Sequence, residues 1–463
     1  MFHKNEYIAR RKQLAGQFSS GILLFLGNEE SPMNFLDNTY HFRQDSTFLY
    51  YFGIQDPGLA AIIDIDEDKV ILFGNEMSMD AIVWMGRQKT LAAKADDAGI
   101  TSVSPSSQLE TYLKTAKGRK VHFLPPYRAE SKIKLADLLD LKLNDLSAAV
   151  SVPFIKAVVA QRSVKSAVEL AELDKASEVS ADMHLIAMQI ARPGMSENEI
   201  AAAVHQVALK SGGQLSYPII LTVQGHILHN HYHGNILKEG DLVLNDSGAE
   251  TAMGYAGDLT RTFPAGKKFL PEQKDAYNIV LHAYQEAVKT LKPGVRYLDL
   301  HYKSCLSLAE GLKSLGLMKG NLEDAVAQGA HALFFQCGTG HMMGLDVHDM
   351  EDLGEQYVGY THELKKNTTQ FGLKSLRLGK ALEEGYVLTV EPGLYFIPEL
   401  IDQWKESNQF SEYINYDKVE AYRNFGGIRV EDDYVVTSDG FRKLGKDLAI
   451  TVEEVEEVRA KAY

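Results

Sequence analysis

Residues 166–194, SAVELAELDKASEVSADMHLIAMQIARPG, predict one long amphipathic helix that ends at Pro193-Gly194. A second long helix is predicted to begin at Pro271 and to end just before Pro293-Gly294. Each Pro-Gly pair is followed by another helical segment, and these segments cover residues 196–213 and 299–316. The repeated order of helix, Pro-Gly and helix indicates an internal duplication, and it predicts two similar α/β halves that share one sheet.

The start and stop signals of segment 196–213 support its assignment as a helix. Ser196 and Glu199 have the spacing of a capping box, in which each residue satisfies a backbone N–H of the other. The segment ends at Gly212-Gly213, a common way to terminate a helix.

The length and composition of the chain favour a globular protein of two domains. It has 463 residues, of which 45% are hydrophobic and 24% charged, and this excludes a disordered or collagen-like chain. One compact core rarely grows beyond roughly 250–300 residues. Strand signals thin out where the long helix begins, so we predict domains at 1–160 and 161–463.

The sequence pattern of residues 1–160 predicts an α/β domain. Short apolar runs with strand character alternate with helical segments such as 106–117. The runs are GILLFLG (21–27), GLAAIIDI (58–65), DKVILFG (68–74) and KVHFLP (120–125).

Charge and cysteine content exclude several classes of protein. The formal net charge is −14, from 48 basic and 62 acidic residues, which disfavours nucleic-acid binding. Two cysteines, Cys305 and Cys337, provide neither a disulfide framework nor a cysteine zinc site, which suits a reducing cytosol. The first residues are charged, and no run of about 18 apolar residues occurs. We therefore expect a cytoplasmic protein without nucleic-acid or membrane partners.

The first two unusual acids lie in a predicted hairpin. LVLNDSG (242–248) alternates and places Asp246 on the same face as Leu244. The returning strand, YAGDLTRTF (255–263), carries Asp258. A buried carboxylate is costly unless it is paired or bound to a metal, and for any single acid a salt bridge is the simpler explanation.

Two more acids lie in strands that are otherwise apolar. Glu391, in YVLTVEPGLYF (386–396), comes just before a Pro-Gly turn. Glu431, in GGIRVEDDYVVT (426–437), shares a face with Arg429. One arginine cannot neutralise four carboxylates, so the four acids together favour a site for divalent cations such as Mn²⁺ or Mg²⁺.

The segment CGTGHMMGLDVHD (337–349) offers imidazole ligands for the same site. It contains His341 and His348 in a context rich in Gly and Met. Imidazole suits borderline metals. A lone histidine is more often structural, whereas two in one such segment favour a role at the site.

In the order found here, these motifs resemble the pita-bread metallopeptidases, in the proline-directed branch of aminopeptidase P and prolidase. The resemblance covers the whole chain, and 42–58, FRQDSTFLYYFGIQDPG, is similar to the aminopeptidase P N-terminal domain. It implies an α/β N-terminal domain of the creatinase/aminopeptidase P type, followed by an α+β pita-bread catalytic domain with an internal pseudo-twofold repeat. Its motifs are AGDLTRTF (256–263), GHMMGLDVHD (340–349), TVEPGLY (389–395) and GGIRVEDD (426–433).

The resemblance implies two metal ions, usually manganese, with cobalt or zinc also suited to such ligands. Asp258 and Glu431 would bridge the two ions. A hydroxide that bridges both ions would attack the peptide bond. The implied ligands, matched motif by motif, are Asp246, Asp258, His341, Glu391 and Glu431.

Further residues match positions at the family's substrate site. His229 and His348 would contact the scissile carbonyl or assist proton transfer. Arg429 would orient a ligand carboxylate, and Tyr395 would donate a hydrogen bond near the site. His231 and His233 have no matching role, and we interpret them as loop histidines. Cys337 departs from the histidine that the family often has there, and we interpret it as a packing residue.

The resemblance leaves two activities open. An Xaa-Pro aminopeptidase needs an open groove, whereas an Xaa-Pro dipeptidase must bind the free carboxylate of proline. The N-terminal domain type favours the aminopeptidase. The long segments 359–380 and 396–427 resemble prolidase, and Arg377 in the first is a candidate carboxylate anchor.

A non-catalytic pita-bread binding protein is a remoter alternative, because such proteins typically lose metal ligands. By resemblance alone, we expect a homodimer or homotetramer that acts on peptides with proline at the second position.

Overall fold

The computed structural model describes residues 1–462. They divide into two compact units, one of Met1–Arg162 with Met350–Tyr357 and one of Ser163–Asp349 with the described residues from Val358 onward. No single helix among these residues is long and apolar enough to span a membrane, although the bent pair Leu143–Ala149 and Val152–Ser163 passes the same test by length and composition.

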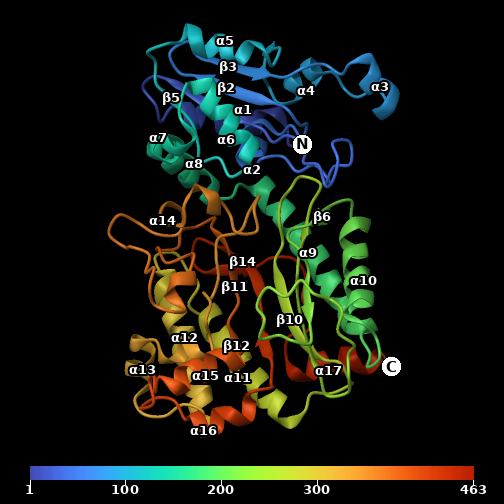
Figure 1. Cartoon of the computed structure of the whole chain (residues 1–463), viewed down its shortest axis with the longest axis vertical. Coiled ribbons are helices and arrows are strands. Elements are labelled where there is room, and N and C mark those ends of the chain that lie inside the picture. The colour runs from blue at the N-terminus through green and yellow to red at the C-terminus, as the bar shows by residue number, and fades with distance from the viewer. Residues whose placement is uncertain (463) are drawn as a thin grey trace. The chain divides into compact units, whose positions relative to one another are not determined.

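The first unit is built on a five-stranded sheet of order β4-β3-β2-β1-β5 (Figure 1). The pairs β1–β2 and β2–β3 are antiparallel, and β3–β4 and β1–β5 are parallel. All four predicted strands and the helix near 106–117 are confirmed. The strands are β1 (Ile22–Leu26), β2 (Ala60–Asp64), β3 (Lys69–Phe73), β4 (Ser102–Ser104) and β5 (Val121–His122). The helices are α1 (Lys4–Ala15), α2 (Ser46–Phe52), α3 (Met79–Met85), α4 (Leu91–Asp97), α5 (Gln108–Thr115), α6 (Ala129–Leu139), α7 (Leu146–Ala149) and α8 (Val152–Ser163).

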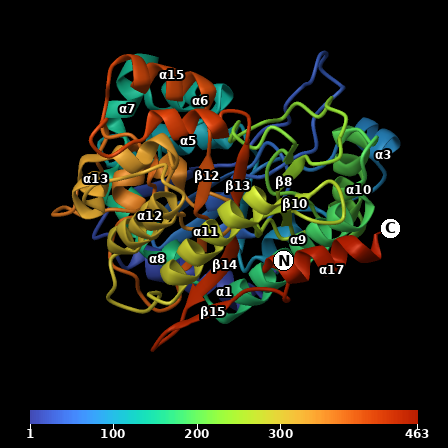
Figure 2. The same ribbon diagram turned by 90° about the horizontal axis from the view of Figure 1, so that it is seen from below.

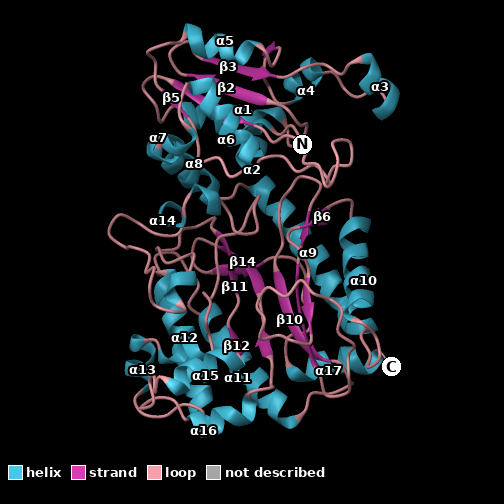
Figure 3. Ribbon diagram, in the orientation of Figure 1, coloured by secondary structure: helices cyan, strands magenta, loops and turns pink. Residues whose placement is uncertain are grey.

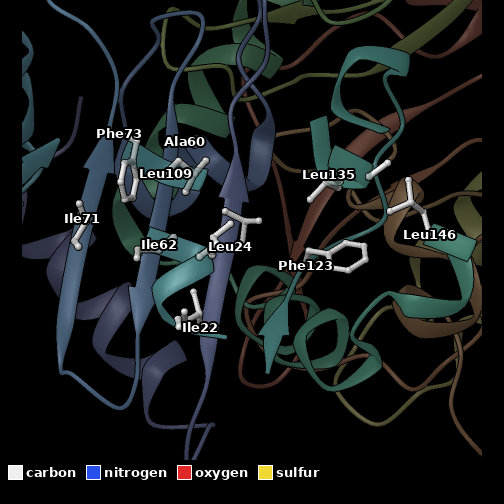
Figure 4. Packing of buried hydrophobic residues seen from close by; sticks show 13 residues of the cluster. Ile22, Leu24, Ala60, Ile62, Ile71, Phe73, Leu109, Phe123, Leu135 and Leu146 are labelled. Carbon is white, nitrogen blue, oxygen red and sulfur yellow. The ribbon is translucent and has the colours of Figure 1, made fainter. Parts of the chain in front are cut away.

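The core of this unit forms because alternate residues of each strand point to one face of the sheet. Figure 4 shows Ile22 and Leu24 of β1 beside Ile62 of β2, with Leu109 of α5 and Leu135 of α6 nearby. All of them are buried.

The second unit begins with the predicted long helix, which is confirmed as α9 (Ala167–Ile190) with a capping box of Ser166 and Glu169. The predicted capping box of Ser196 and Glu199 is also present, and it starts α10. The other helices of this unit are α10 (Glu197–Lys210), α11 (Pro271–Val288), α12 (Tyr297–Ser314), α13 (Leu322–Gln328), α15 (Pro398–Glu406), α16 (Tyr416–Val419) and α17 (Val452–Lys461), while α14 (Glu355–Val358) spans the division between the units.

Figures 2 and 3 show the strands of this unit lying among these helices. Helices α9 and α11 pack directly on the strands, α10 packs on α9, and α12 packs on α11. The strand orders are β10-β8-β7 and β11-β14-β15 in two three-stranded sheets, with β12-β13 and β6-β9 as two further pairs. The strands are β6 (Gln214–Leu215), β7 (Ile220–Thr222), β8 (Leu242–Ser247), β9 (Ala249–Glu250), β10 (Leu259–Pro264), β11 (Val387–Val390), β12 (Gly393–Tyr395), β13 (Gly427–Arg429), β14 (Asp432–Val436) and β15 (Phe441–Lys443).

The predicted internal repeat is confirmed by matching backbone hydrogen bonds. The N–H of Gly194 donates to Leu237, and the N–H of Gly294 donates to Leu382, both at 2.8 Å. Each acceptor is followed three residues later by a glycine with positive φ, and each glycine precedes a buried strand, β8 or β11. The two halves of the unit therefore repeat one helix–helix–strand plan.

Two predicted strands are each broken in the structure. Segment 386–396 forms β11 and β12, and segment 426–437 forms β13 and β14. The first break falls at Glu391-Pro392, because proline has no N–H to give to the ladder. The second falls at Val430-Glu431, where the N–H of Glu431 donates instead to Thr260 at 3.0 Å. Both breaks thus lie at the predicted metal ligands.

Candidate metal centre

Three of the predicted metal ligands lie in one row across adjacent strands. The β8–β10 register places Asp246 opposite Thr260, and a β-bridge pairs Thr260 with Glu431. The registers of β11–β14 and β12–β13, continued into the gap between them, both place Glu391 opposite Glu431. Asp246 of β8, Thr260 of β10 and the two strand breaks at Glu431 and Glu391 therefore form one row. The two halves meet in this row through the isolated Thr260–Glu431 bridge rather than through one continuous sheet.

Asp246 and Glu391 occupy equivalent positions in the two halves. Each lies six residues after the positive-φ glycine that starts its strand, Gly240 or Gly385. Thr260 lies opposite Asp246 in one half, and Glu431 lies opposite Glu391 in the other. Thr260 and Glu431 are therefore also equivalent in the repeat. Since these two residues also pair with each other, the pseudo-twofold axis of the unit passes between them.

His341 reaches the row from a segment that runs beside β11. The N–H of Thr389 donates to His341 at 3.0 Å, and the N–H of Glu391 donates to Thr339 at 2.7 Å. This pairing brings His341 Nε2 within 3.3 Å of Asp258 Oδ2 and 3.5 Å of Glu391 Oε1.

The orientation of the His341 ring suits a metal ligand. Its Nδ1 lies 3.0 Å from the carbonyl oxygen of Met342 and must donate to it. In the neutral ring, Nε2 then presents a lone pair to two carboxylate oxygens, an arrangement that is stable only with a cation or a proton between them.

Burial and mutual repulsion shift the pKa values of the carboxyl groups. Burial raises the pKa of Glu391 to about 7 and that of Glu431 well above its ordinary value. Burial also raises the pKa of Asp246, although Arg429 opposes the shift. Burial acts on Asp258 in the same direction, but the hydrogen bond and charge of His341 outweigh it and lower the pKa.

The donor set fits divalent cations. Ligand atoms of Asp258, His341 and Glu431 lie within 4.8 Å of one another, and all three side chains are buried. Without a cation, the raised pKa values mean that Glu391 and Glu431 retain protons that a metal would replace. Oxygen-rich sites with one imidazole suit Mn²⁺ and related ions.

The site opens into a cavity of about 230 Å³. All five predicted ligands line it, as do three of the four other predicted site residues, His229, His348 and Arg429. The fourth, Tyr395, does not line the cavity, but its hydroxyl accepts a hydrogen bond from Nη1 of the lining residue Arg429 at 2.7 Å. The structure therefore brings the whole predicted set together.

Arg429 holds the row in place. Its Nη2 donates to Asp246, and its Nε donates to the hydroxyl of Thr260 at 3.1 Å. The Thr260 hydroxyl in turn donates to Glu431 Oε2 at 2.6 Å. A chain of hydrogen bonds thus links two predicted ligands.

Two site residues were not predicted from the sequence. Thr260 lies two residues after Asp258 in an alternating strand, so period-two spacing could have indicated it. Tyr217 lies 2.7 Å from Asp246 Oδ1 and 2.5 Å from Asp258 Oδ1 through its hydroxyl. It follows strand β6 and precedes Pro218, and nothing in its local sequence indicates this role.

His229, His231 and His348 line the cavity beside the predicted ligands. The rings of His341 and His348 meet edge to face with centroids 4.4 Å apart. Burial lowers the pKa of His229, so this ring is neutral at physiological pH. His231 lies in a loop as expected, but it also lines the cavity, and so does Cys337. The interpretation of Cys337 as a packing residue is therefore incomplete.

Two family models match the chain. One, described as metallopeptidase family M24, matches residues 171–438. The other, described as the aminopeptidase P N-terminal domain, matches residues 7–123.

Curated relatives match the chain over nearly its full length. An Xaa-Pro aminopeptidase of Escherichia coli is 29% identical over 99% of this chain and 98% of the relative. An Xaa-Pro dipeptidase of Mus musculus is 31% identical over 96% of this chain and 90% of the relative.

Solved structures agree with these matches. A histidine-to-alanine variant of Escherichia coli aminopeptidase P superposes with a TM-score of 0.82 at 29% identity, covering 100% of this chain and 99% of the other. Another form of that enzyme, zinc-substituted and in complex with product, has a TM-score of 0.81 at 28% identity, with the same coverage.

Proposed function

Since the chain belongs to metallopeptidase family M24, we propose that it hydrolyses the Xaa-Pro bond at the N-terminus of peptides, as an Xaa-Pro aminopeptidase. The observation that carries the proposal is the cluster of Asp258, His341 and Glu431 in a cavity that Asp246 and Glu391 also line. Every ligand position of the family motifs is filled, which argues against a non-catalytic binding protein.

The proposal assigns two divalent cations, most simply Mn²⁺ with Co²⁺ or Zn²⁺ as alternatives, to the five ligands. Asp258 and Glu431, whose ligand atoms lie within 4.8 Å of each other and of a His341 ring nitrogen, would hold cations together with Asp246, His341 and Glu391, and the family resemblance implies that both ions would share these two carboxylates. When bound, such a pair of cations supplies a nucleophile from water at neutral pH and polarises the scissile carbonyl.

The protein's own residues position these groups and the substrate. Arg429 fixes the carboxylate of Asp246 and, through Thr260, that of Glu431. We assign His229 and His348 to the substrate, where an imidazole can donate a hydrogen bond to the carbonyl oxygen or pass a proton to the leaving amine. Their place on the cavity wall supports this assignment.

A second candidate, an Xaa-Pro dipeptidase, is favoured by one observation. Arg377 lines the same cavity as the predicted ligands, where a guanidinium can bind the free carboxylate of a dipeptide. The similarity to the mouse dipeptidase supports this candidate as well.

The proposal includes an aminopeptidase P-type domain at 1–160 and a catalytic domain at 161–463, which the matched ranges 7–123 and 171–438 support. The proposal also includes a cytoplasmic location, a homodimeric or homotetrameric state, and peptide substrates with proline at the second position.

One assay separates the candidates. The metal-loaded protein is incubated with Mn²⁺ and three matched substrates: Xaa-Pro, Xaa-Pro-Yaa and Xaa-Ala-Yaa. Cleavage of Xaa-Pro-Yaa before proline supports the aminopeptidase, whereas cleavage of Xaa-Pro alone supports the dipeptidase. If neither proline peptide is cleaved, the proposed activity is rejected.

A further inference from the structure

A second group of metal-ligating side chains lies away from the cavity. His301 and Cys305 belong to α12, and His331 belongs to the 3₁₀ turn Ala330–Leu333 that packs on this helix. One ligand atom from each lies within 4.8 Å of the other two, and the side chains are buried with exposures of 0%, 0% and 2%. None of these residues lines the cavity of the candidate metal centre.

The spacing and distances suit one tetrahedral cation. His301 and Cys305 are four residues apart, so both side chains lie on one face of α12. The Cys305 Sγ–His301 Nε2 distance is 3.5 Å. A tetrahedral zinc ion with bonds of about 2.3 Å to sulfur and about 2.0–2.1 Å to nitrogen separates those two atoms by about 3.6 Å.

His331 gives an independent indication of a missing partner. Neither of its ring nitrogens has a hydrogen-bond partner within residues 1–462. Native proteins rarely leave a buried polar group without a hydrogen-bond partner, because the group loses its contacts with water and gains nothing in return. A cation between His331, His301 and Cys305 would give one of these two nitrogens a partner.

We propose that His301, Cys305 and His331 form a second metal site, separate from the candidate metal centre, which binds Zn²⁺ through one thiolate and two imidazoles. Zinc is favoured over Mn²⁺ and Mg²⁺ because a thiolate is a soft ligand and the set has no carboxylate.

The protonation states agree with this assignment. Burial lowers the pKa of His301 to about 3 and that of His331 to about 4, so both rings are neutral and can ligate. His301 Nδ1 lies 2.8 Å from the Thr339 hydroxyl, and donation to this oxygen leaves Nε2 free for the metal. Burial raises the pKa of the Cys305 thiol, so zinc binding there releases one proton.

Thr339 connects this site to the candidate metal centre. Its hydroxyl contacts His301, while its carbonyl oxygen accepts the N–H of Glu391 at 2.7 Å. It also lies two residues before His341. A cation held by α12 would therefore stiffen the segment that carries His341 and that accepts the N–H of Glu391.

The test compares bound zinc in the whole protein and in Cys305→Ala, after loading with Zn²⁺ and removal of the excess. Cys305→Ala is expected to bind one zinc ion fewer per chain than the unchanged protein, and Cys337→Ala, the matched control, loses no zinc from the second site. This difference does not depend on peptidase activity, so the proposed function can fail without affecting it.

Cobalt gives a second measurement. With Co²⁺ the unchanged protein and Asp258→Asn should both show thiolate-to-cobalt absorption in the near ultraviolet, and Cys305→Ala should not. Equal zinc content in the unchanged protein and Cys305→Ala, with no such absorption, overturns the proposal. Should Cys305→Ala fail to fold, X-ray absorption of zinc-loaded Cys337→Ala decides: a sulfur neighbour at about 2.3 Å supports the site, and its absence rejects it.

Discussion

The hydroxyl of Thr260 donates a 2.6 Å hydrogen bond to Glu431, and a β-bridge joins the same two residues. They are equivalent residues of the internal repeat, so this contact lies where the two halves of the second unit meet. The hydroxyl also accepts from Arg429 Nε at 3.1 Å. Thr260 therefore holds a proposed metal ligand without being one of the predicted ligands itself.

We predict that Thr260→Val lowers metal affinity or kcat by about 10–100-fold, the usual loss when a group that orients a ligand is removed. The shape of the side chain is kept, so the melting temperature of the metal-free protein should change little. Metal titration and peptidase assays measure the effect, with Thr437→Val in a surface turn as control. Unchanged affinity and kcat would show that Glu431 needs no such support.

Asp258→Asn should reduce kcat by more than about 100-fold, which is beyond the effect expected from residues outside the ligand set. The substitution removes one negative charge and one ligand oxygen while keeping the size of the side chain. Steady-state kinetics with saturating Mn²⁺ measure the loss, and Asp439→Asn in the surface turn serves as control. Activity near that of the unchanged protein would reject the ligand assignment.

The stabilisation that Mn²⁺ gives to the folded protein should increase from pH 5.5 to pH 7.5. In the metal-free fold the pKa of Glu391 is raised to about 7, so its proton adds stability at low pH, and this contribution is lost as the pH rises through 7. Metal binding requires the carboxylate form, and protons compete with the metal below this pKa.

The measurement is the difference in melting temperature with and without Mn²⁺ at each pH. The buried histidines outside the site titrate alike in both samples, so their contribution to the melting temperature cancels in this difference. Glu391→Gln should bind the metal more weakly and show a flatter pH dependence. A difference that is constant from pH 5.5 to 7.5 would contradict the coupling.

Arg377→Leu tests the dipeptidase candidate. If the guanidinium binds the free carboxylate of Xaa-Pro, its loss should raise KM for that substrate about 10–100-fold, as expected for one hydrogen bond to a charged group. The amide Xaa-Pro-NH₂ lacks this carboxylate, so its KM should be unchanged. Equal effects on both substrates would remove Arg377 as a carboxylate anchor.

Lys165 and Asp349 form an ion pair at 2.7 Å in which each side chain is only 1% exposed. Lys165→Met leaves a buried carboxylate without this cation, and it should destabilise the protein by about 3–5 kcal/mol. The double variant Lys165→Met/Asp349→Leu should recover much of the loss, because both members of the buried pair are then apolar. Thermal unfolding of the two variants measures this, and additive losses would contradict the prediction.

The sequence by itself determined the repeat and the types of ligand. Helix-length apolar periodicity, the two Pro-Gly stops and the capping box of Ser196 are local signals, and each is present in the structure. The unusual acids could also be found locally, because an acid in an apolar strand stands out against its neighbours.

Only the tertiary structure decided how those residues meet. Strands 386–396 and 426–437 read as continuous, since a sequence does not show that Glu431 donates its N–H to Thr260 across the repeat. Tyr217, which contacts Asp246 and Asp258, was missed for the same reason: its partners lie 29 and 41 residues away. The types of residue in the sequence indicate the chemistry of the site. Its geometry depends on pairing between segments that are distant in the sequence.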